Sequence, residues 1–470
     1  MRALRHWSAR HAVGLKRVYD MTVAMTVPLR PLMRILGRDR FDRLARPVER
    51  VGKELFFDCK MCGQCALSST GMSCPTNCAK TMRNGPCGGV RSNGMCEVDP
   101  EMRCVWVEAY KGREKLAKAG ISSQTTLAPI DYREFGKSTW ARVVAKEPEL
   151  EKEILETEGA VPTFDSETHP FAAACQSDRF LTTVEIAPPD TVDPAPLLKR
   201  AAHFTGLVDA MNITDGAGGN CHMSSVAAAT LLMREGHEAV CQFSCRDRNR
   251  IALQGDLLGA ATMGIRNVVC LTGDDVSCGD HPMAKPVFDL DSVSLLRIAR
   301  HMRDDGQMAS GRKLGKNPDF FIGATSNPFV PPYDDRIVNL EAKVDAGAQF
   351  IQTQFCFDLP LLERFMERVR ERGLHRRCAI IIGVGTLNTA KALGRMREMV
   401  PGVHIPDQIL ARIAQAEDQK AEGKRILIET MQALANIEGV SGTHVMGYRN
   451  ESVLADAIRE SGIRSVKRHR

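Results

Sequence analysis

The sequence of 470 residues lacks a long apolar run, and no segment approaches the roughly 18 to 20 residues that a membrane span requires. The nearest candidate, residues 21–36, is interrupted by Pro28, Arg30, Pro31 and Arg34. The first residues also lack a secretory signal of the usual form. We therefore expect a cytoplasmic protein without a transmembrane segment.

Aromatic residues are scarce, at 5% of the chain, and none is interleaved with basic residues in a base-reading motif. This absence argues against nucleic acid as a partner. Charge is uneven, because the first 50 residues hold 12 Lys and Arg against 4 Asp and Glu while the whole chain carries only +6. Such a segment is suited to binding acidic lipid or an acidic protein. We favour the simpler interpretation, in which its helices are solvated and pack on the next domain.

Histidine is absent from residues 59–104, although eight of the 16 cysteines lie there. The other eight are scattered from 175 to 378 in apolar runs and are expected to be small buried hydrophobes. In a cytosolic chain, a dense set is typical of a metal or cluster site rather than of disulfides. The predicted ligands are Cys59, Cys62, Cys65, Cys74, Cys78, Cys87, Cys96 and Cys104.

The cysteine spacing begins C-x2-C-x2-C, which lets a tight turn bring thiolates together on one ion or cluster. A [4Fe-4S] cluster and zinc both accept all-sulfur ligands, so the sequence leaves the cofactor open between them. Two four-thiolate sites, or one site with spare thiols, remain open as well. Zinc would only fold this region, whereas a cluster would carry electrons.

The remainder of the chain alternates short runs rich in Val, Ile and Phe with longer helical patterns. Eight such runs predict a (β/α)8 TIM barrel, and the lack of G-x-G-x-x-G after the first run argues against a doubly wound sheet. We expect a basic helical segment at 1–50, a cysteine-rich domain at 51–120, a linker at 121–177 and the barrel at 178–465. The predicted strands are residues 180–187, 208–215, 238–245, 267–274, 319–326, 350–358, 379–385 and 442–448.

Barrel active sites form at the carboxyl ends of the strands, where this sequence places many polar residues. A glutamate inside "TVEIAPP" is unusual for a barrel strand, and burial there would favour its protonated, proton-donating form. A salt-bridged strand end for Glu185, a helix cap for Asp274 and a loop hydrogen bond for Gln354 are the alternatives. Together the strand ends suggest a site for a polar heterocyclic ligand, formed by Glu185, Thr214, Asp215, Gln242, Ser244, Asp274, Ser326, Asn327, Gln354 and Gly383.

The blocks "TVEIAPP", "VCLTGDD", "NLEAKVDAGAQFIQTQFCFD" and "GTHVMGYRNE" resemble the methylenetetrahydrofolate reductase family, whose members are FAD-containing barrels. The cysteine stretch resembles the family's C-terminal, zinc-binding domain, which in some acetogenic bacteria is a separate iron–sulfur subunit. The resemblance implies hydride transfer between FAD and 5,10-methylenetetrahydrofolate, giving 5-methyltetrahydrofolate or the reverse. It also implies a folate substrate and leaves a homo-oligomer open.

The resemblance implies roles for single residues. Glu185 matches the general acid, Asp274 matches the catalytic aspartate that binds the pterin and adjusts the flavin, and Gln354 matches a glutamine that contacts folate. Residues at or near FAD-contacting positions are Thr214, Gln242, Thr272, Asn327, Lys343 and Ala348.

Several of these positions depart from the family pattern. Gln242 stands where the family has a histidine, Thr272 stands where it has an arginine, and "GATSNP" replaces a block with a tyrosine beside the flavin. These changes favour electrons that arrive by another route, such as the cysteine region or an electron-donor protein. They also keep open a non-redox alternative, in which the barrel binds folate as a methyl-handling partner of a corrinoid methyltransferase.

Overall fold

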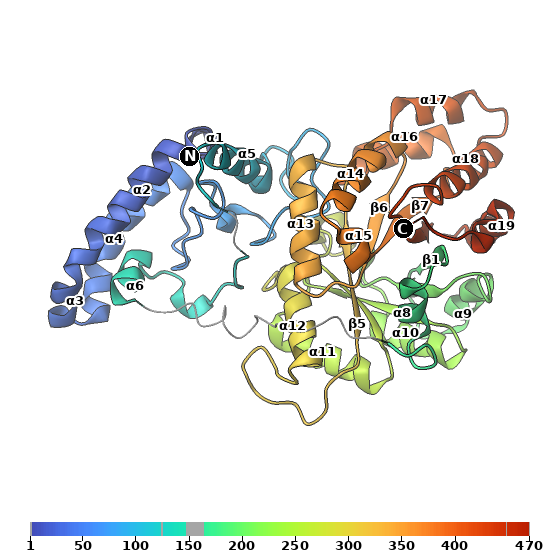
Figure 1. Ribbon diagram of the computed structural model, residues 1–470, viewed down its shortest axis with the longest axis horizontal. Coiled ribbons are helices and arrows are strands. Elements are labelled where there is room, and N and C mark those ends of the chain that lie inside the picture. Colours follow the sequence, from blue (N-terminus) through green and yellow to red (C-terminus); the bar gives the residue numbers. More distant parts are fainter. Residues whose placement is uncertain (1, 124–125, 147–163, 448, 470) are drawn as a thin grey trace. The chain divides into compact units, whose positions relative to one another are not determined.

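A computed structural model describes residues 2–123, 126–146, 164–447 and 449–469 of the chain (Figure 1). The chain divides into two compact units. The first comprises Met1–Pro86, Gly94–Ile154 and Asp289–Asp291, and the second comprises Cys87–Asn93, Leu155–Phe288 and Ser292–Arg470. Within the described residues, no helix has the length and apolar character needed to cross a membrane. Part of the expected linker, residues 147–163, lies outside the described residues.

The second unit contains a closed barrel of eight parallel strands, each hydrogen-bonded to the next in sequence order, which confirms the predicted (β/α)8 fold. Strand β8 pairs with β1 from Leu181 opposite Gly442 to Val184 opposite Val445 and so closes the barrel. Every predicted strand segment contains a strand. The strands are β1 Leu181–Ile186, β2 Ala210–Ile213, β3 Ala239–Ser244, β4 Asn267–Leu271, β5 Phe321–Ser326, β6 Phe350–Phe355, β7 Ala379–Gly385 and β8 Gly442–Met446.

Helices follow the strands, as right-handed crossovers between parallel strands require. Between β7 and β8 there are three of them, α16 to α18. The helices of this unit are α8 Pro170–Gln176, α9 Ala195–Ala202, α10 Ser225–Arg234, α11 Arg250–Thr262, α12 Ser292–Asp304, α13 Tyr333–Asp345, α14 Leu359–Glu371, α15 Leu374–Arg377, α16 Ala390–Met399, α17 Asp407–Gln415, α18 Gln419–Leu434 and α19 Glu451–Ser461, with short 3-10 turns η4 Ala217–Gly219, η5 Val276–Cys278 and η6 Ile463–Ser465.

The interior of the barrel is layered, because successive side chains of a strand point to opposite faces. At the amino end, Phe171 of α8 packs edge-on against Phe321 and Phe350, with ring centroids 5.9 and 5.2 Å apart. The surrounding apolar layer is made by the first residues of the strands. Positions two and four residues beyond this layer therefore face the interior nearer the carboxyl end. The strand members of the layer are Leu181, Ala210, Val240, Val269, Phe321, Phe350, Ala379 and Ile381.

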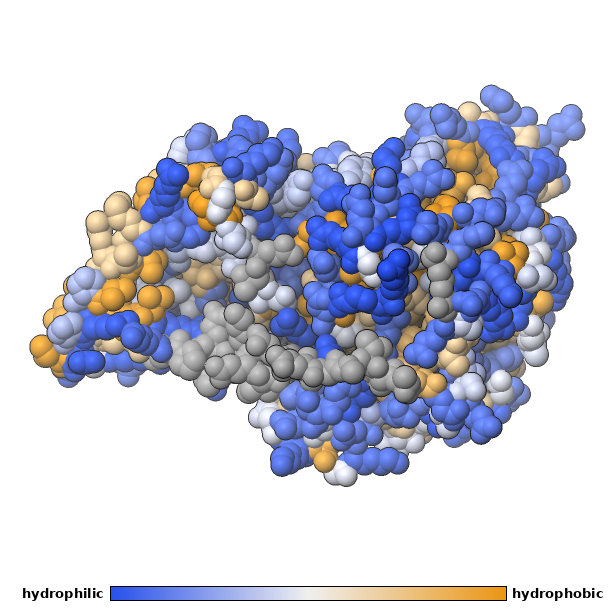
Figure 2. All heavy atoms as spheres, in the orientation of Figure 1, coloured by the Kyte–Doolittle hydropathy of each residue, from blue (hydrophilic) through white to orange (hydrophobic). Residues whose placement is uncertain are grey.

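The first unit is mainly helical around a cysteine-rich segment with little regular structure. Its apolar core includes Ala12, Phe57, Leu67, Met72 and Leu116. Figure 2 shows hydrophobic side chains on the surface of this unit, over the region of α2 to α4. Its helices are α1 Arg2–Arg10, α2 Ala12–Thr26, α3 Arg30–Leu36, α4 Arg38–Phe57, α5 Val105–Lys118 and α6 Thr139–Ala145, with turns η1 Val27–Leu29, η2 Pro75–Asn77 and η3 Tyr132–Glu134.

Candidate active site at the carboxyl end of the barrel

Glu185 lies on β1 opposite Asn212 of β2. It is four residues beyond Leu181 of the apolar layer, so its side chain faces the barrel interior. The side chain is 31% exposed, and its Oε2 lies 3.8 Å from Nε2 of His444, whose own side chain is 3% exposed. Glu185 is therefore half-buried, more open to solvent than the sequence led us to expect. Its close neighbour is a buried imidazole.

His444 on β8 belongs to a buried polar cluster beneath Glu185. Its Nδ1 lies 2.9 Å from Oγ1 of Thr183, two residues before Glu185 on β1. The Nε2 of Gln352 on β6 lies 3.4 Å from the same imidazole nitrogen and 3.5 Å from the Thr183 hydroxyl. This cluster fixes the ring of His444 with Nε2 directed toward Glu185. Sequence reasoning missed all three residues, although the unusual polar residues of "GTHVMG" and "IQTQ" were the available signal.

Unpartnered polar atoms lie next to this cluster. Both amide atoms of Asn212, Oε1 of Gln352 and Oγ1 of Thr214 are buried and have no hydrogen-bond partner in the structure. Asn212 is level with Glu185, and Thr214 continues the interior face of β2. Since buried polar groups ordinarily have partners, these atoms mark where a polar ligand or water would bind. The residues present thus fit a polar cofactor at the end of β2.

Asp274 follows β4 and anchors the glycine-rich turn after β2. Its Oδ2 accepts a hydrogen bond of 3.0 Å from the backbone N–H of Gly218, which has a φ of +65°. The helix cap that was the alternative role for Asp274 belongs to the next residue, because the side chain of Asp275 accepts from Ser277 at the start of η5. Asp274 itself is exposed at the carboxyl end of the barrel. Its carboxylate is therefore placed to meet a ligand there.

Asp215 and Ser244 link the ends of β2 and β3 by a hydrogen bond. Asp215 accepts 2.8 Å from the backbone N–H of Ser244 and also pairs with the guanidinium of Arg248. Burial raises the pKa of Asp215 above its ordinary value, although the charge of Arg248 acts in the opposite direction. These interactions hold the two strand ends in place beside Thr214. We read Asp215 as structural rather than as a proton donor.

Gln242, Thr272 and Gln354 lie on three different strand ends. Gln242 is 8% exposed and Thr272 is 9% exposed, so neither reaches freely into solvent. Gln354 uses its Oε1 locally, accepting 3.0 Å from the backbone N–H of Phe355. No described residue accepts a hydrogen bond from its NH2 group, which remains available to a ligand. The loop bond that was the alternative role for Gln354 therefore occupies only half of the amide.

The remaining predicted cofactor residues are used within the protein. Asn327, after β5, donates from Nδ2 to the carbonyls of Gly88 and Gly402 at 2.6 and 2.8 Å. Lys343 donates 2.7 Å to the carbonyl of Thr325. Ala348 is buried and bonds to the end of α13. Of the two other strand-end candidates, Ser326 is buried, and the backbone N–H of Gly383 donates 2.9 Å to Oγ1 of Thr353.

The eight predicted metal ligands are not joined in disulfides, and they fall into groups. Burial raises the pKa of Cys74 to about 12, with further contributions from Cys62, Cys59 and Cys65, so these four thiols share one neighbourhood. Burial likewise raises the pKa of Cys78 to about 12, and Cys104 and Cys96 contribute there.

Cys87 belongs to the second unit, where its carbonyl accepts 2.8 Å from Arg336. Among the described residues, no three His, Cys, Asp or Glu side chains are placed closely enough to hold a metal ion. The donor chemistry fits a soft metal, but the placement shows no coordination geometry. We therefore derive no electron-transfer step through these thiols.

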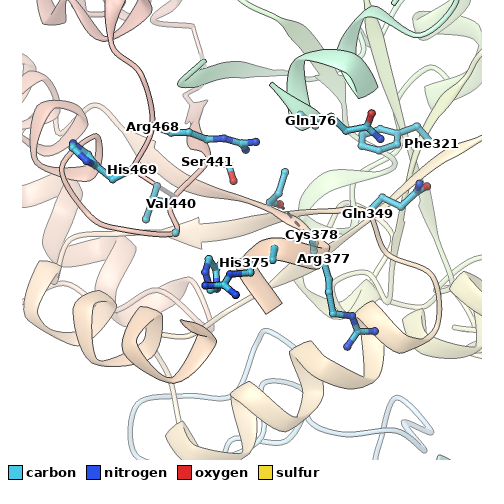
Figure 3. A pocket seen from close by; sticks show the side chains of 14 residues that line it. Gln176, Phe321, Gln349, His375, Arg377, Cys378, Val440, Ser441, Arg468 and His469 are labelled. Atoms are coloured by element: carbon cyan, nitrogen blue, oxygen red, sulfur yellow. Dashed lines mark hydrogen bonds between the residues drawn. The ribbon is translucent and has the colours of Figure 1, made fainter. Parts of the chain in front are cut away.

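A cavity of about 640 Å³ lies at the opposite, amino end of the barrel (Figure 3). His375, Arg377, Arg468 and His469 surround it, and none of the predicted site residues lines it. Barrel enzymes carry their chemistry at the carboxyl end, so we assign this cavity no part in catalysis. The closed barrel of eight strands defines the chain as a TIM-barrel protein, and the polar cluster around Glu185 is its candidate site.

Comparison with known families agrees with that class and narrows it. Residues 171–462 match the family described as "Methylenetetrahydrofolate reductase", and residues 39–133 match "Methylene-tetrahydrofolate reductase C terminal". The first match covers more than half of the chain and coincides with the barrel. The chain therefore belongs to the methylenetetrahydrofolate reductase family.

Curated relatives are distant. Methylenetetrahydrofolate reductase 1 of Schizosaccharomyces pombe is 23% identical over 54% of this chain and 40% of its own length. The 5,10-methylenetetrahydrofolate reductase of Pectobacterium carotovorum is 28% identical over 46% of this chain and 66% of its own length. The chain thus spans less than two thirds of these relatives. A Clostridium thermocellum protein that binds 5-methyl-5,6,7,8-tetrahydrofolic acid has a TM-score of 0.44 at 14% identity, covering 63% of this chain and 99% of its own.

Proposed function

We propose that the chain is a flavin-dependent methylenetetrahydrofolate reductase, acting on 5,10-methylenetetrahydrofolate or, in reverse, on 5-methyltetrahydrofolate. The observation that carries the proposal is the half-buried Glu185 held against the His444 cluster at the carboxyl end of a barrel of this family. A carboxyl group in contact with a fixed imidazole is suited to proton transfer. We place the protein in the cytoplasm, in keeping with sixteen cysteines that are not joined in disulfides.

The residues proposed to hold FAD surround the ends of β2 to β6. When bound, FAD would supply the hydride for the folate carbon. The unpartnered hydroxyl of Thr214 and the amide of Gln242 are the side chains best able to bind its polar groups. Lys343 and Asn327 would act mainly by shaping the site, since both are bonded to backbone carbonyls. Thr272 and Ala348 complete the proposed set.

Glu185 is proposed as the general acid that protonates the folate nitrogen and opens the methylene bridge. The Nε2 of His444 then exchanges a proton with the Glu185 carboxyl, and Thr183 and Gln352 hold the ring for that exchange. Asp274 would stabilise the cationic folate formed by ring opening, because a carboxylate attracts a nearby cation. The free NH2 group of Gln354 would donate to the pterin.

The test uses purified, FAD-reconstituted protein and measures flavin reoxidation by methylenetetrahydrofolate under anaerobic conditions. Glu185→Gln should lower the rate about 10²- to 10⁴-fold, the usual contribution of a general acid, while bound flavin is retained. Glu167→Gln is the matched control, because Glu167 is an exposed carboxylate just before α8. Protein that binds neither flavin nor folate would refute the proposal.

His444→Asn separates proton exchange from simple folding. The variant should shift the pH profile of kcat and lower kcat more than KM changes, because the imidazole acts on Glu185 and does not itself need to contact folate. If the variant is less stable but the pH profile of kcat is unchanged, His444 only supports the barrel.

A second candidate function is non-redox binding of a methylated folate as a partner of a corrinoid methyltransferase. It is favoured by the engagement of Asn327 and Lys343 with backbone carbonyls, which leaves fewer groups for a flavin. Equilibrium dialysis distinguishes the two. Tight folate binding without retention of added FAD would support this second function and contradict the first.

The cysteine-rich region is proposed to bind zinc or [4Fe-4S], with Cys59, Cys62, Cys65 and Cys74 as one four-thiolate set and Cys78, Cys96 and Cys104 in a second group. We also propose that an electron-donor protein supplies electrons to the chain and that the chain forms a homo-oligomer. Metal and sulfide analysis with a visible spectrum after anaerobic purification tests the metal. A colourless, zinc-loaded protein would exclude an electron-carrying cluster.

A further inference from the structure

The helix α4 of the first unit differs from an ordinary amphipathic helix, because it buries charged side chains and exposes aliphatic ones. Its buried residues include Asp42, Glu49 and Lys53. Glu49 and Lys53 form an ion pair of 2.5 Å with side chains only 1% and 4% exposed. A surface helix normally turns its apolar stripe toward the core and its charges toward water. In α4 the buried face combines these charges with Phe41 and Phe57, and the outer face leaves aliphatic side chains exposed.

The outward face of α4 carries an apolar stripe at helical spacing. Leu44, Val48, Val51 and Leu55 are 64%, 65%, 72% and 51% exposed, and intervals of four, three and four residues put them on one side of the helix. No described residue of their own unit covers them.

The preceding helices α2 and α3 add to this stripe. Among the described residues, exposed large hydrophobics continue along them, with Val18, Met21, Met25, Leu29, Leu32 and Ile35 between 41% and 81% exposed. We call these ten side chains, from Val18 to Leu55, the apolar face of the first unit (Figure 2). Contiguous apolar patches larger than a few hundred Å² are rare on monomers and mark interaction sites, so exposed aliphatic side chains gathered on neighbouring helices call for a partner.

Exposed arginines accompany the apolar face. Arg17, Arg34 and Arg40 are exposed, and within the described part of the chain no carboxylate lies at ion-pair distance from any of them. By contrast, the acids of α2 and α4 take part in ion pairs, apart from the exposed Asp39 of α4. Asp20 pairs with Lys16, for example, and Glu54 pairs with Arg50. The face therefore combines aliphatic side chains with uncompensated positive charge.

Charge complementarity selects the partner. A second copy of the chain would bring the same arginines together, and like charges across an interface oppose association. The apolar face contains Val, Leu, Ile and Met but no Trp or Tyr, two of the residue types that dominate the binding energy of protein interfaces. Aliphatic helices flanked by arginines, whose stems lie along apolar surface while the guanidinium groups reach headgroups, are typical of binding to an anionic bilayer.

We propose that the apolar face of the first unit binds the surface of an anionic membrane, with α2 to α4 lying in the interface. The helices enter the headgroup region by their aliphatic side chains, and Arg17, Arg34 and Arg40 contact anionic headgroups. The binding is peripheral and involves no spanning helix. It is independent of the folate reaction proposed above.

The test is cosedimentation of the full chain with vesicles of phosphatidylcholine, either pure or with about 30 mol% phosphatidylglycerol. We expect the bound fraction to rise about tenfold with the anionic lipid and to fall as salt is added, since salt screens the arginines. Leu44→Gln/Val51→Gln should lower binding to anionic vesicles about tenfold. Arg34→Gln/Arg40→Gln should remove most of the difference between the two vesicle types.

The matched control is Val192→Gln/Ile251→Gln in the barrel unit, two aliphatic side chains that are 97% and 76% exposed. This control should bind like the unchanged protein. Absence of binding to anionic vesicles at low salt would overturn the proposal, as would equal losses in the control and in Leu44→Gln/Val51→Gln. A doubled mass by light scattering that Leu44→Gln/Val51→Gln abolishes would instead assign the face to a second copy and overturn the membrane assignment.

Discussion

The two units of this chain differ in where they place charged and aliphatic side chains. The barrel closes its amino end with Phe171, Phe321 and Phe350 and keeps polar groups for the layer below Glu185. The first unit buries the Glu49–Lys53 ion pair and leaves aliphatic side chains such as Val51 exposed. The barrel is thus stabilised from within by apolar packing. The first unit has an apolar core as well, but it adds a buried charge pair that is costly to disrupt, and it leaves aliphatic side chains of α4 exposed.

The largest effect is expected in the barrel. Phe171→Ala removes the ring that α8 packs between Phe321 and Phe350, and it should lower the free energy of unfolding by about 3–5 kcal/mol. Urea unfolding followed by circular dichroism measures this loss. Phe135→Ala, at a 45% exposed ring of the first unit, is the control and should change stability by less than about 0.5 kcal/mol. Equal losses would remove the contrast between the two cores.

The next effect tests the buried charges. Lys53→Met leaves the buried charge of Glu49 without its partner, although Glu49 also accepts hydrogen bonds from the Ser138 hydroxyl and the backbone N–H of Trp140. We expect the free energy of unfolding to fall by about 3 kcal/mol. The double variant Glu49→Gln/Lys53→Met should lose less than the sum of the two single variants, because they share one interaction. Lys118→Met, at a 74% exposed side chain, serves as the control. Strict additivity would mean that the ion pair contributes nothing specific.

The smallest effect concerns a surface ion pair of the barrel. Partial burial acts to raise the pKa of Asp304, but the guanidinium groups of Arg303 and Arg300 outweigh it and hold the pKa below its ordinary value. A depressed carboxyl pKa contributes stability above the unfolded pKa of about 3.9, and this contribution is lost as pH falls through the folded pKa.

The test is the urea midpoint of unfolding, measured from pH 5 downward. This range covers about one to two pH units around the unfolded pKa of the carboxyl group. The midpoint of the unchanged protein should fall more steeply than that of Asp304→Asn. Parallel curves would show that this pair does not link protonation to folding.

The fold was predictable from the sequence to a high degree. All eight predicted strands are present because parallel strands buried on both faces have continuous Val, Ile and Phe runs, a signal that needs no tertiary information. The positions of Glu185 and Asp274 at the carboxyl ends follow directly from that assignment. His444 and Thr183 were not predictable as neighbours, because β1 and β8 are about 260 residues apart and only barrel closure joins them.

The amino-acid sequence by itself determined the barrel, the order of its strands and the thiol-rich character of residues 59–104, because period and spacing are local properties of a chain. The expectation that the basic first helices would simply pack and be solvated missed the exposure of Val48 and Val51. Only the tertiary structure decided which face of α4 is buried, since an amphipathic pattern states that a helix has two faces and not which one meets the core. In the same way, only closure of the barrel placed the imidazole of His444 3.8 Å from the carboxylate of Glu185.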